Sequence, residues 1–197
     1  MPHRYNVELE TLDCLCYYRT KYPWQGPLGW GISLWTRSDK VHAGWVLKED
    51  GRVLVCDATG DYVDVRPVSA DLLHGRRIKV LRMPNLTIPD PHALTRFAHE
   101  SWGVMKYGYA KFFLNAFAEI FGQPWSTDPK KAPKRVVCSE FVSLTLRKYG
   151  RIPVNGGSEM AADPCPHFAD TFTTPRDLDK KSRLVTVTDM LTIAAQF

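Results

Sequence analysis

The segment KVHAGWVLKEDGRVLVCDA (residues 40–58) predicts a β-hairpin that carries a His–Asp pair. Two apolar, β-branched runs flank Asp50-Gly51, a dipeptide that favours a tight turn. A four-residue loop would place His42 directly opposite Asp57, whereas the two-residue turn would place Asp57 one diagonal step away. In both registers the side chains share a face, because strand side chains alternate. A three-residue loop or a bulge would instead turn Asp57 to the other face. Even on a common face, His42 and Asp57 could be an ordinary cross-strand pair on the surface, with no role in chemistry.

The composition predicts one globular domain over residues 1–197. Hydrophobic residues make up 44% of the chain and charged residues 24%, which is sufficient for a core without a disulfide or metal. Lys and Arg number 26 against 21 Asp and Glu, and the formal net charge of +5 favours anionic partners in general. The basic residues are dispersed and accompany no nucleic-acid-binding module, so we expect no nucleic-acid partner.

The start of the chain and its cysteines suggest where the protein is made. No apolar signal-peptide region and no run of 18 apolar residues occurs, so we expect synthesis in the cytoplasm and no transmembrane segment. The five cysteines are irregularly spaced, which predicts reduced thiols rather than a disulfide framework.

The order of predicted elements indicates an α+β class, with strands first and helices later. β-branched and aromatic runs bounded by turn residues predict strands at 30–36, 41–47, 52–58, 62–65 and 77–82. Apolar residues at helical spacing predict helices at 91–102, 109–121 and 138–149. Residues 151–173 are predicted to form a long irregular loop, followed by a helix start at 174–177 and a last strand over 183–188.

Cys138 lies at the start of the helix predicted within PKRVVCSEFVSLTLRKYG (residues 133–150). Unsatisfied N–H groups and the helix dipole favour negative charge there, and such positions lower the pKa of a thiol. Cys138 is therefore a candidate nucleophile, or else a buried apolar residue, as free cysteines commonly are. A thiol nucleophile needs a base, and His42 has the carboxylate partner that the competing bases His99 and His167 lack in sequence.

Together these segments resemble the circularly permuted branch of the NlpC-type cell-wall peptidases, which are relatives of papain. CSEFVSLTLRKYG is similar to the nucleophile helix, GPLGWGISLWTRSDKVHAGWV to the lead-in and His strands, and LVCDATG to the strand with the third polar residue. The resemblance implies a permuted papain-like fold, in which a central antiparallel sheet packs against helices and the His hairpin precedes the Cys helix. It implies that Cys138 is the nucleophile, His42 the base and Asp57 the orienting residue.

The activity implied by the resemblance is hydrolysis of an amide bond through a thioacyl-enzyme, without a cofactor. The backbone N–H of Cys138 is a candidate oxyanion donor. The substrate associated with the family is bacterial peptidoglycan, and since bacteriophages encode this branch too, a virion tail-associated wall hydrolase is a further expectation. Two alternatives stay open. One is a lipid acyltransferase or acyl hydrolase related to lecithin:retinol acyltransferase, and the other is a non-catalytic docking module of a larger assembly.

Further residues are candidates for substrate or metal contacts. Trp30, Tyr107 and His167 are candidate substrate-binding residues. Four other positions have side chains that zinc accepts, although their spacing is not that of common zinc modules, so we expect no metal. These are Cys14, Cys16, Cys165 and His167.

Overall fold

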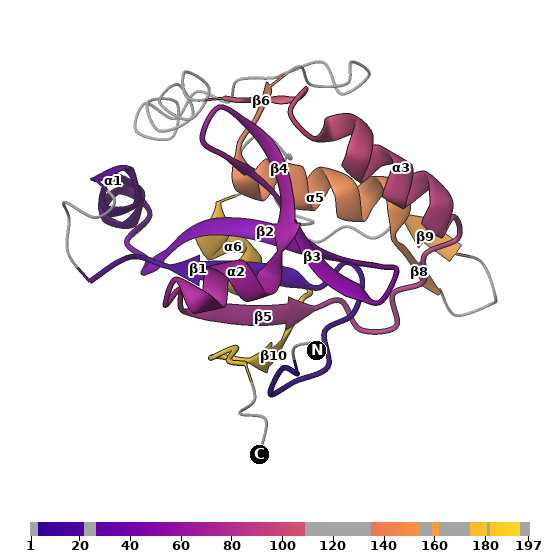
Figure 1. Ribbon diagram of the computed structural model, residues 1–197, viewed down its shortest axis with the longest axis horizontal. Coiled ribbons are helices and arrows are strands. Elements are labelled where there is room, and N and C mark those ends of the chain that lie inside the picture. Colours follow the sequence, from indigo (N-terminus) through magenta and orange to yellow (C-terminus); the bar gives the residue numbers. More distant parts are fainter. Residues whose placement is uncertain are drawn as a thin grey trace.

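The computed structural model of the chain describes residues 4–21, 27–108, 135–153, 159–161, 174–180 and 182–193. At its centre lies an eight-stranded sheet with the strand order β10-β5-β1-β2-β3-β4-β6-β7 (Figure 1). Neighbouring strands are antiparallel except for the short parallel pair β6–β7. The strands of this sheet are β1 (Cys14–Tyr18), β2 (Lys40–Glu49), β3 (Arg52–Thr59), β4 (Tyr62–Pro67), β5 (Ile78–Arg82), β6 (Lys106–Tyr107), β7 (Arg135–Val136) and β10 (Val185–Thr188).

Helices cover both faces of the sheet. They are α1 (Pro27–Thr36), α2 (Val68–Leu73), α3 (Pro91–Ser101), α5 (Cys138–Tyr149) and α6 (Pro175–Lys180). Residues of α3, α5 and α6 share one apolar cluster with one face of the sheet, and α2 contributes to the cluster on the other face. A separate two-stranded sheet pairs β8 (Arg151–Pro153) with β9 (Glu159–Ala161).

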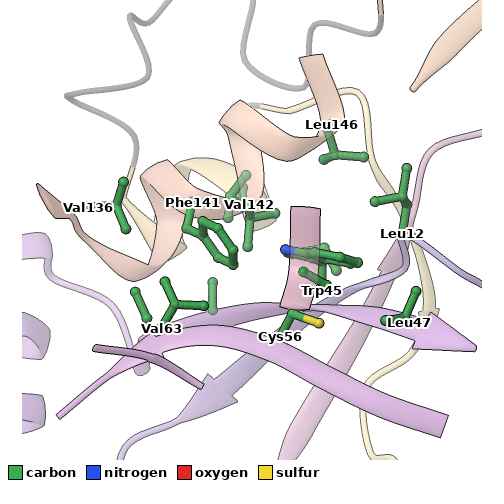
Figure 2. Packing of buried hydrophobic residues seen from close by; sticks show 14 of the residues in the cluster. Leu12, Trp45, Leu47, Cys56, Val63, Val136, Phe141, Val142 and Leu146 are labelled. Carbon is green, nitrogen blue, oxygen red and sulfur yellow. The ribbon is translucent and has the colours of Figure 1, made fainter. Parts of the chain in front are cut away.

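The larger cluster holds α5 against the central strands. Trp45 of β2 and Phe141 of α5 are fully buried, with ring centroids 6.2 Å apart, and Figure 2 shows Phe141, Val142 and Leu146 directed toward the sheet. These apolar residues recur at helical spacing, so one whole side of α5 is buried. The start of α5, where Cys138 lies, is thereby fixed relative to β2 and β3.

The β2–β3 hairpin uses the two-residue turn Asp50-Gly51. Both residues have positive φ, 46° and 73° respectively, as a tight turn matched to the strand twist requires. Asp57 consequently pairs with Gly44 and lies one diagonal step from His42. Of the two registers that the sequence allows, this is the one with the shorter loop.

The structure confirms most of the predicted elements, and it also confirms the α+β class. The predicted strands at 41–47, 52–58, 62–65, 77–82 and 183–188 correspond to β2, β3, β4, β5 and β10, and the helices at 91–102, 138–149 and 174–177 to α3, α5 and α6. The predicted helix at 109–121 lies outside the described residues.

Two predictions about elements are wrong, and several elements were missed, among them β1, α2 and β6. Residues 30–36 belong to α1 rather than to a strand, because the segment WGISLWT alternates but also buries Ile32, Ser33 and Thr36 at helical spacing. Residues 151–173 are not wholly irregular, since β8 and β9 lie within them. The six-residue helix α2 is too short for a clear periodic signal.

Candidate active site

Cys138 is the first residue of α5. Val137 precedes it in an extended conformation, with φ −94° and ψ 161°, and its N–H donates to Glu140 Oε2 at 3.2 Å. This bond satisfies a backbone donor at the helix start. Cys138 is 3% exposed, so the thiol faces the protein interior.

Strands β2 and β3 stop pairing next to the thiol of Cys138. Within residues 27–108, the β2–β3 ladder ends at the pair Gly44–Asp57 and does not continue to Ala43 and Ala58. The N–H of Ala43 instead donates to the sulfur of Cys138. A backbone donor that would ordinarily bond the neighbouring strand therefore stabilises charge on the thiol.

His42 lies between the thiol and Asp57. Its Nε2 is 2.8 Å from Asp57 Oδ2, and Asp57 is completely buried whereas the His42 side chain is 15% exposed. The His42 ring also hydrogen-bonds the Cys138 side chain. Because Nε2 is occupied by Asp57, Nδ1 is the ring nitrogen available to the thiol. The structure therefore brings together the three residues predicted as a triad.

The electrostatics of the three residues favour the charged forms. Burial opposes charge on His42, but Asp57 and then Cys138 outweigh it and raise the pKa of His42 to about 10. Burial likewise opposes ionisation of Asp57, yet His42 and Arg66 lower its pKa to about 2. The pKa of the Cys138 thiol is lowered, because His42 and two backbone N–H groups outweigh desolvation. This pattern is that of a thiolate–imidazolium pair.

Asp57 is held from behind by Arg66 of β4. The guanidinium makes two bonds to the carboxylate, Nη1–Oδ1 and Nη2–Oδ2, both 2.7 Å long. Arg66 Nη2 also donates to Asp71 Oδ2 at 3.0 Å, and the hydroxyl of Tyr17 donates to the same oxygen at 2.7 Å. A bidentate pair of this kind fixes both the position and the plane of the carboxylate.

Tyr17, which bonds Asp71, also contacts His42 through its aromatic ring. The ring centroids of Tyr17 and His42 are 5.2 Å apart, with planes inclined by 50°. Neither Tyr17 nor Arg66 was predicted from the sequence. The available signal was the alternation in β4, where Asp64 and Arg66 alternate with buried valines and Asp64 pairs with Asp57, which places these charges on the face of the triad.

A cavity of about 660 Å³ lies beside His42. Its described walls come from the end of β1, α1, the start of β2, the β3–β4 turn and the segment after α2, together with Tyr107. Tyr107, a predicted substrate-binding residue, thus lies in the wall of this cavity. Trp30 is not among these lining residues and lies under the Arg19 guanidinium, 4.0 Å from carbon to ring centroid. His167 lies outside the described residues.

The remaining candidate groups lie away from this cavity or outside the described residues. Cys14 and Cys16 are buried in the core with their sulfurs 3.9 Å apart, and Cys165 lies outside the described residues, as His167 does. Among the residues that the structure describes, no group of three or more His, Cys, Asp or Glu side chains could hold a metal ion. In the same part of the chain, no helix is long and apolar enough to cross a membrane.

His99 has a carboxylate partner that the sequence did not indicate. Its Nε2 is 3.0 Å from Glu49 Oε1, at the turn end of β2. His42 lies near the other end of that strand. The structure thus gives His99 a partner that no sequence signal indicated, but the pair is half-exposed and belongs to the opposite end of the hairpin from the triad.

Comparisons with known proteins bear on the fold alone. No protein-family model matches the chain. No curated protein matches it either. Among solved structures, the chain is similar to one described as metalloprotein yiiX from Escherichia coli O157:H7, DUF1105, with a TM-score of 0.59 and 16% identity over 93% of this chain and 98% of that one.

Proposed function

We propose that the protein is a cysteine hydrolase that cleaves amide bonds, with Cys138 as nucleophile, His42 as acid and base, and Asp57 as the orienting group. The observation that carries the proposal is the convergence of the three side chains from β2, β3 and α5. The 2.8 Å bond from His42 to Asp57 and the bond from His42 to the Cys138 side chain supply the two contacts that thiol catalysis requires.

The proposed reaction proceeds through a thioester. The Cys138 thiolate attacks the carbonyl carbon of the amide and forms a C–S bond, and the carbonyl oxygen takes the negative charge. The Cys138 N–H, at the helix start, is a donor for this oxyanion. The His42 imidazolium then gives its proton to the leaving nitrogen as the C–N bond breaks. His42, now neutral, accepts a proton from the water that attacks the thioester. The sulfur then departs as a thiolate when the C–S bond breaks, which restores the thiolate–imidazolium pair and releases the acid.

We also propose that the fold is the permuted papain-like arrangement. The support is the order of elements: the strand of His42 and the hairpin with Asp57 precede the helix of Cys138, and this helix packs on the sheet. The resemblance in sequence makes peptides of the bacterial wall the first substrates to assay. It also makes a tail-associated enzyme of a virion the biological setting to examine first.

A lipid acyltransferase or acyl hydrolase is the second candidate. The observation that favours it is the apolar part of the cavity wall, to which α1 contributes Leu28 and Ile32 and β2 contributes Val41. Charged and tyrosine side chains share that wall, so it is not a continuous lipid-like groove. Amide hydrolysis therefore stays the leading proposal.

The test is the pH dependence of Cys138 alkylation by iodoacetamide, read by peptide mass spectrometry. We expect Cys138 to react at pH 6 faster than buried Cys56, whose pKa is raised by desolvation and by Asp57. His42→Ala should remove this advantage, whereas His99→Ala, the matched change in the other His–carboxylate pair, should keep it. Wall peptides and lipid esters are then assayed with wild type and Cys138→Ala. An unreactive Cys138 in wild type would favour the non-catalytic docking module.

A further inference from the structure

The cavity beside His42 has a one-sided charge. Four of its lining residues carry a permanent positive charge, namely Arg19, Lys21, Arg76 and Arg77, and no Asp or Glu is among the described lining residues. A concave wall of one sign concentrates its field inside the cavity, where low-dielectric surroundings reduce screening. The cavity is therefore suited to an anionic group.

Aromatic rings hold two of these arginines in place. The guanidinium carbon of Arg19 lies 4.0 Å from the Trp30 ring centroid, and that of Arg77 lies 4.8 Å from the Tyr18 centroid. Neither guanidinium makes an ion pair with a carboxylate in the described part of the chain. Arg19 Nη1 also donates to Ser33 Oγ at 3.4 Å. Stacking orients the plane of a guanidinium and leaves its remaining edge N–H groups to bind an oxyanion.

The carboxylates near the cavity form ion pairs with basic side chains. Asp57 and Asp71 both bond Arg66, and Asp71 also forms an ion pair with Arg76 of the cavity wall, with Nε 3.6 Å from Oδ1. Asp39 bonds Lys40 at 2.7 Å, although the field of Arg19 also helps to lower the pKa of Asp39. Asp71 therefore offsets part of the charge of Arg76, and Asp39 offsets part of the charge of Arg19. Among the described residues, Arg77 forms no ion pair with a carboxylate.

We infer that this cavity binds a carboxylate of the substrate, so that the proposed enzyme acts on acidic peptides. The inference rests on the proposed amide hydrolysis. His42, Arg19 and Arg77 all line this cavity, so a carboxylate bound there shares the cavity with the proposed catalytic base. A guanidinium binds a carboxylate through two parallel N–H groups, and its charge attracts the substrate over several ångströms.

Two alkylating reagents of equal size but different charge test the inference. Iodoacetate carries a carboxylate and iodoacetamide does not, so the ratio of their rate constants at Cys138 measures the preference for an anion. The iodoacetamide rate of each variant is the denominator, which removes any change in thiol reactivity. We expect Arg19→Gln and Arg77→Gln each to lower the ratio about threefold, and Arg77→Lys to restore it. Added salt should lower the ratio in wild type.

Arg52→Gln is the matched control, because Arg52 is exposed at the turn end of the hairpin and the change removes the same charge. It should leave the ratio unchanged. A ratio that is also unchanged in Arg19→Gln, Arg77→Gln and their combination would overturn the inference.

Calorimetry in Cys138→Ala separates this result from failure of the proposed chemistry. We expect glutarate to bind, and to bind about threefold more weakly when Arg77 is changed to Gln. Binding of glutarate by a protein whose Cys138 does not react with iodoacetamide would support the anion site and refute the hydrolase. Absence of glutarate binding, or tighter binding of inorganic phosphate than of glutarate, would overturn the assignment to a carboxylate.

Discussion

Arg66→Gln is the change that most directly tests how the triad is held. The wild-type guanidinium makes two 2.7 Å bonds to Asp57, which is completely buried, and a 3.0 Å bond to Asp71, which is 5% exposed. Glutamine removes the charge and cannot replace both bonds. Loss of one partner from a buried ion pair costs about 3–5 kcal/mol. We therefore expect the free energy of unfolding at pH 7 to fall by that amount.

The pH dependence of this loss has a definite sign. The pKa of Asp57 is about 2 in the folded protein, against an ordinary value of 3.8. The ionised carboxyl group therefore stabilises the fold above pH 4 by about 2 kcal/mol, and this contribution disappears as the pH falls toward 2. In Arg66→Gln, part of this stabilisation by the ionised Asp57 carboxyl group is lost. The difference in stability between wild type and Arg66→Gln should be constant near neutrality and shrink on acidification.

The assay is urea unfolding followed by tryptophan fluorescence between pH 7 and pH 3, with Cys138 alkylation at pH 6 as a second readout. Arg82→Gln is the matched control. Arg82 makes two 2.7 Å bonds to Asp13, which is 1% exposed and precedes β1 at the end of that strand away from the triad.

Both changes should cost stability, but only Arg66→Gln should slow alkylation, by about tenfold or more, because the imidazolium is misplaced. The reasoning is refuted if Arg66→Gln unfolds within 1 kcal/mol of wild type at pH 7 or alkylates at the wild-type rate.

Three further changes probe the hairpin, the triad and the core. Gly44→Ala adds a Cβ that would lie 2.9 Å from Asp57 Cβ, so thermal unfolding should show a loss of about 1–3 kcal/mol; Gly31→Ala, which meets nothing within 4 Å, should show none, and equal losses would contradict this. Asp57→Asn removes the charge that raises the pKa of the neighbouring imidazolium, so Cys138 alkylation should begin at higher pH, and an unmoved profile would count against the triad. Phe141→Ala empties a fully buried site and should lower the free energy of unfolding in urea by about 3–5 kcal/mol, with a loss below 1 kcal/mol indicating that α5 packs differently.

The sequence predicted those elements whose determinants are local. Asp50-Gly51 and the alternating runs around it specify the β2–β3 hairpin without reference to the rest of the chain. The error at α1 has the opposite origin, since WGISLWT satisfies both a strand and a helix pattern and only packing distinguishes them. The β8–β9 pair depends on two three-residue strands that stabilise one another, and such short strands leave almost no periodic signal.

The residues of the candidate site likewise fall into those that local sequence identifies and those that depend on tertiary contacts. His42 and Asp57 were paired because the parity of the hairpin fixes their common face in either register considered. Cys138 was placed at a helix start by its position before a periodic run. Arg66 and Tyr17 were not found, because their contacts require the strand order β1-β2-β3-β4 and the position of α2. Side chains that act through tertiary neighbours become visible only when the sheet is assembled.

The end of the β2–β3 ladder explains why the thiol and the sheet depend on each other. A backbone N–H that leaves a ladder and stays buried costs about 1–3 kcal/mol if it finds no acceptor. The N–H of Ala43, a fully buried residue, donates to the sulfur of Cys138. A thiolate is a better acceptor than a thiol, since hydrogen bonds to charged groups are stronger. The opening of the strands thus favours the ionised nucleophile, and the ionised nucleophile compensates for the opening of the strands.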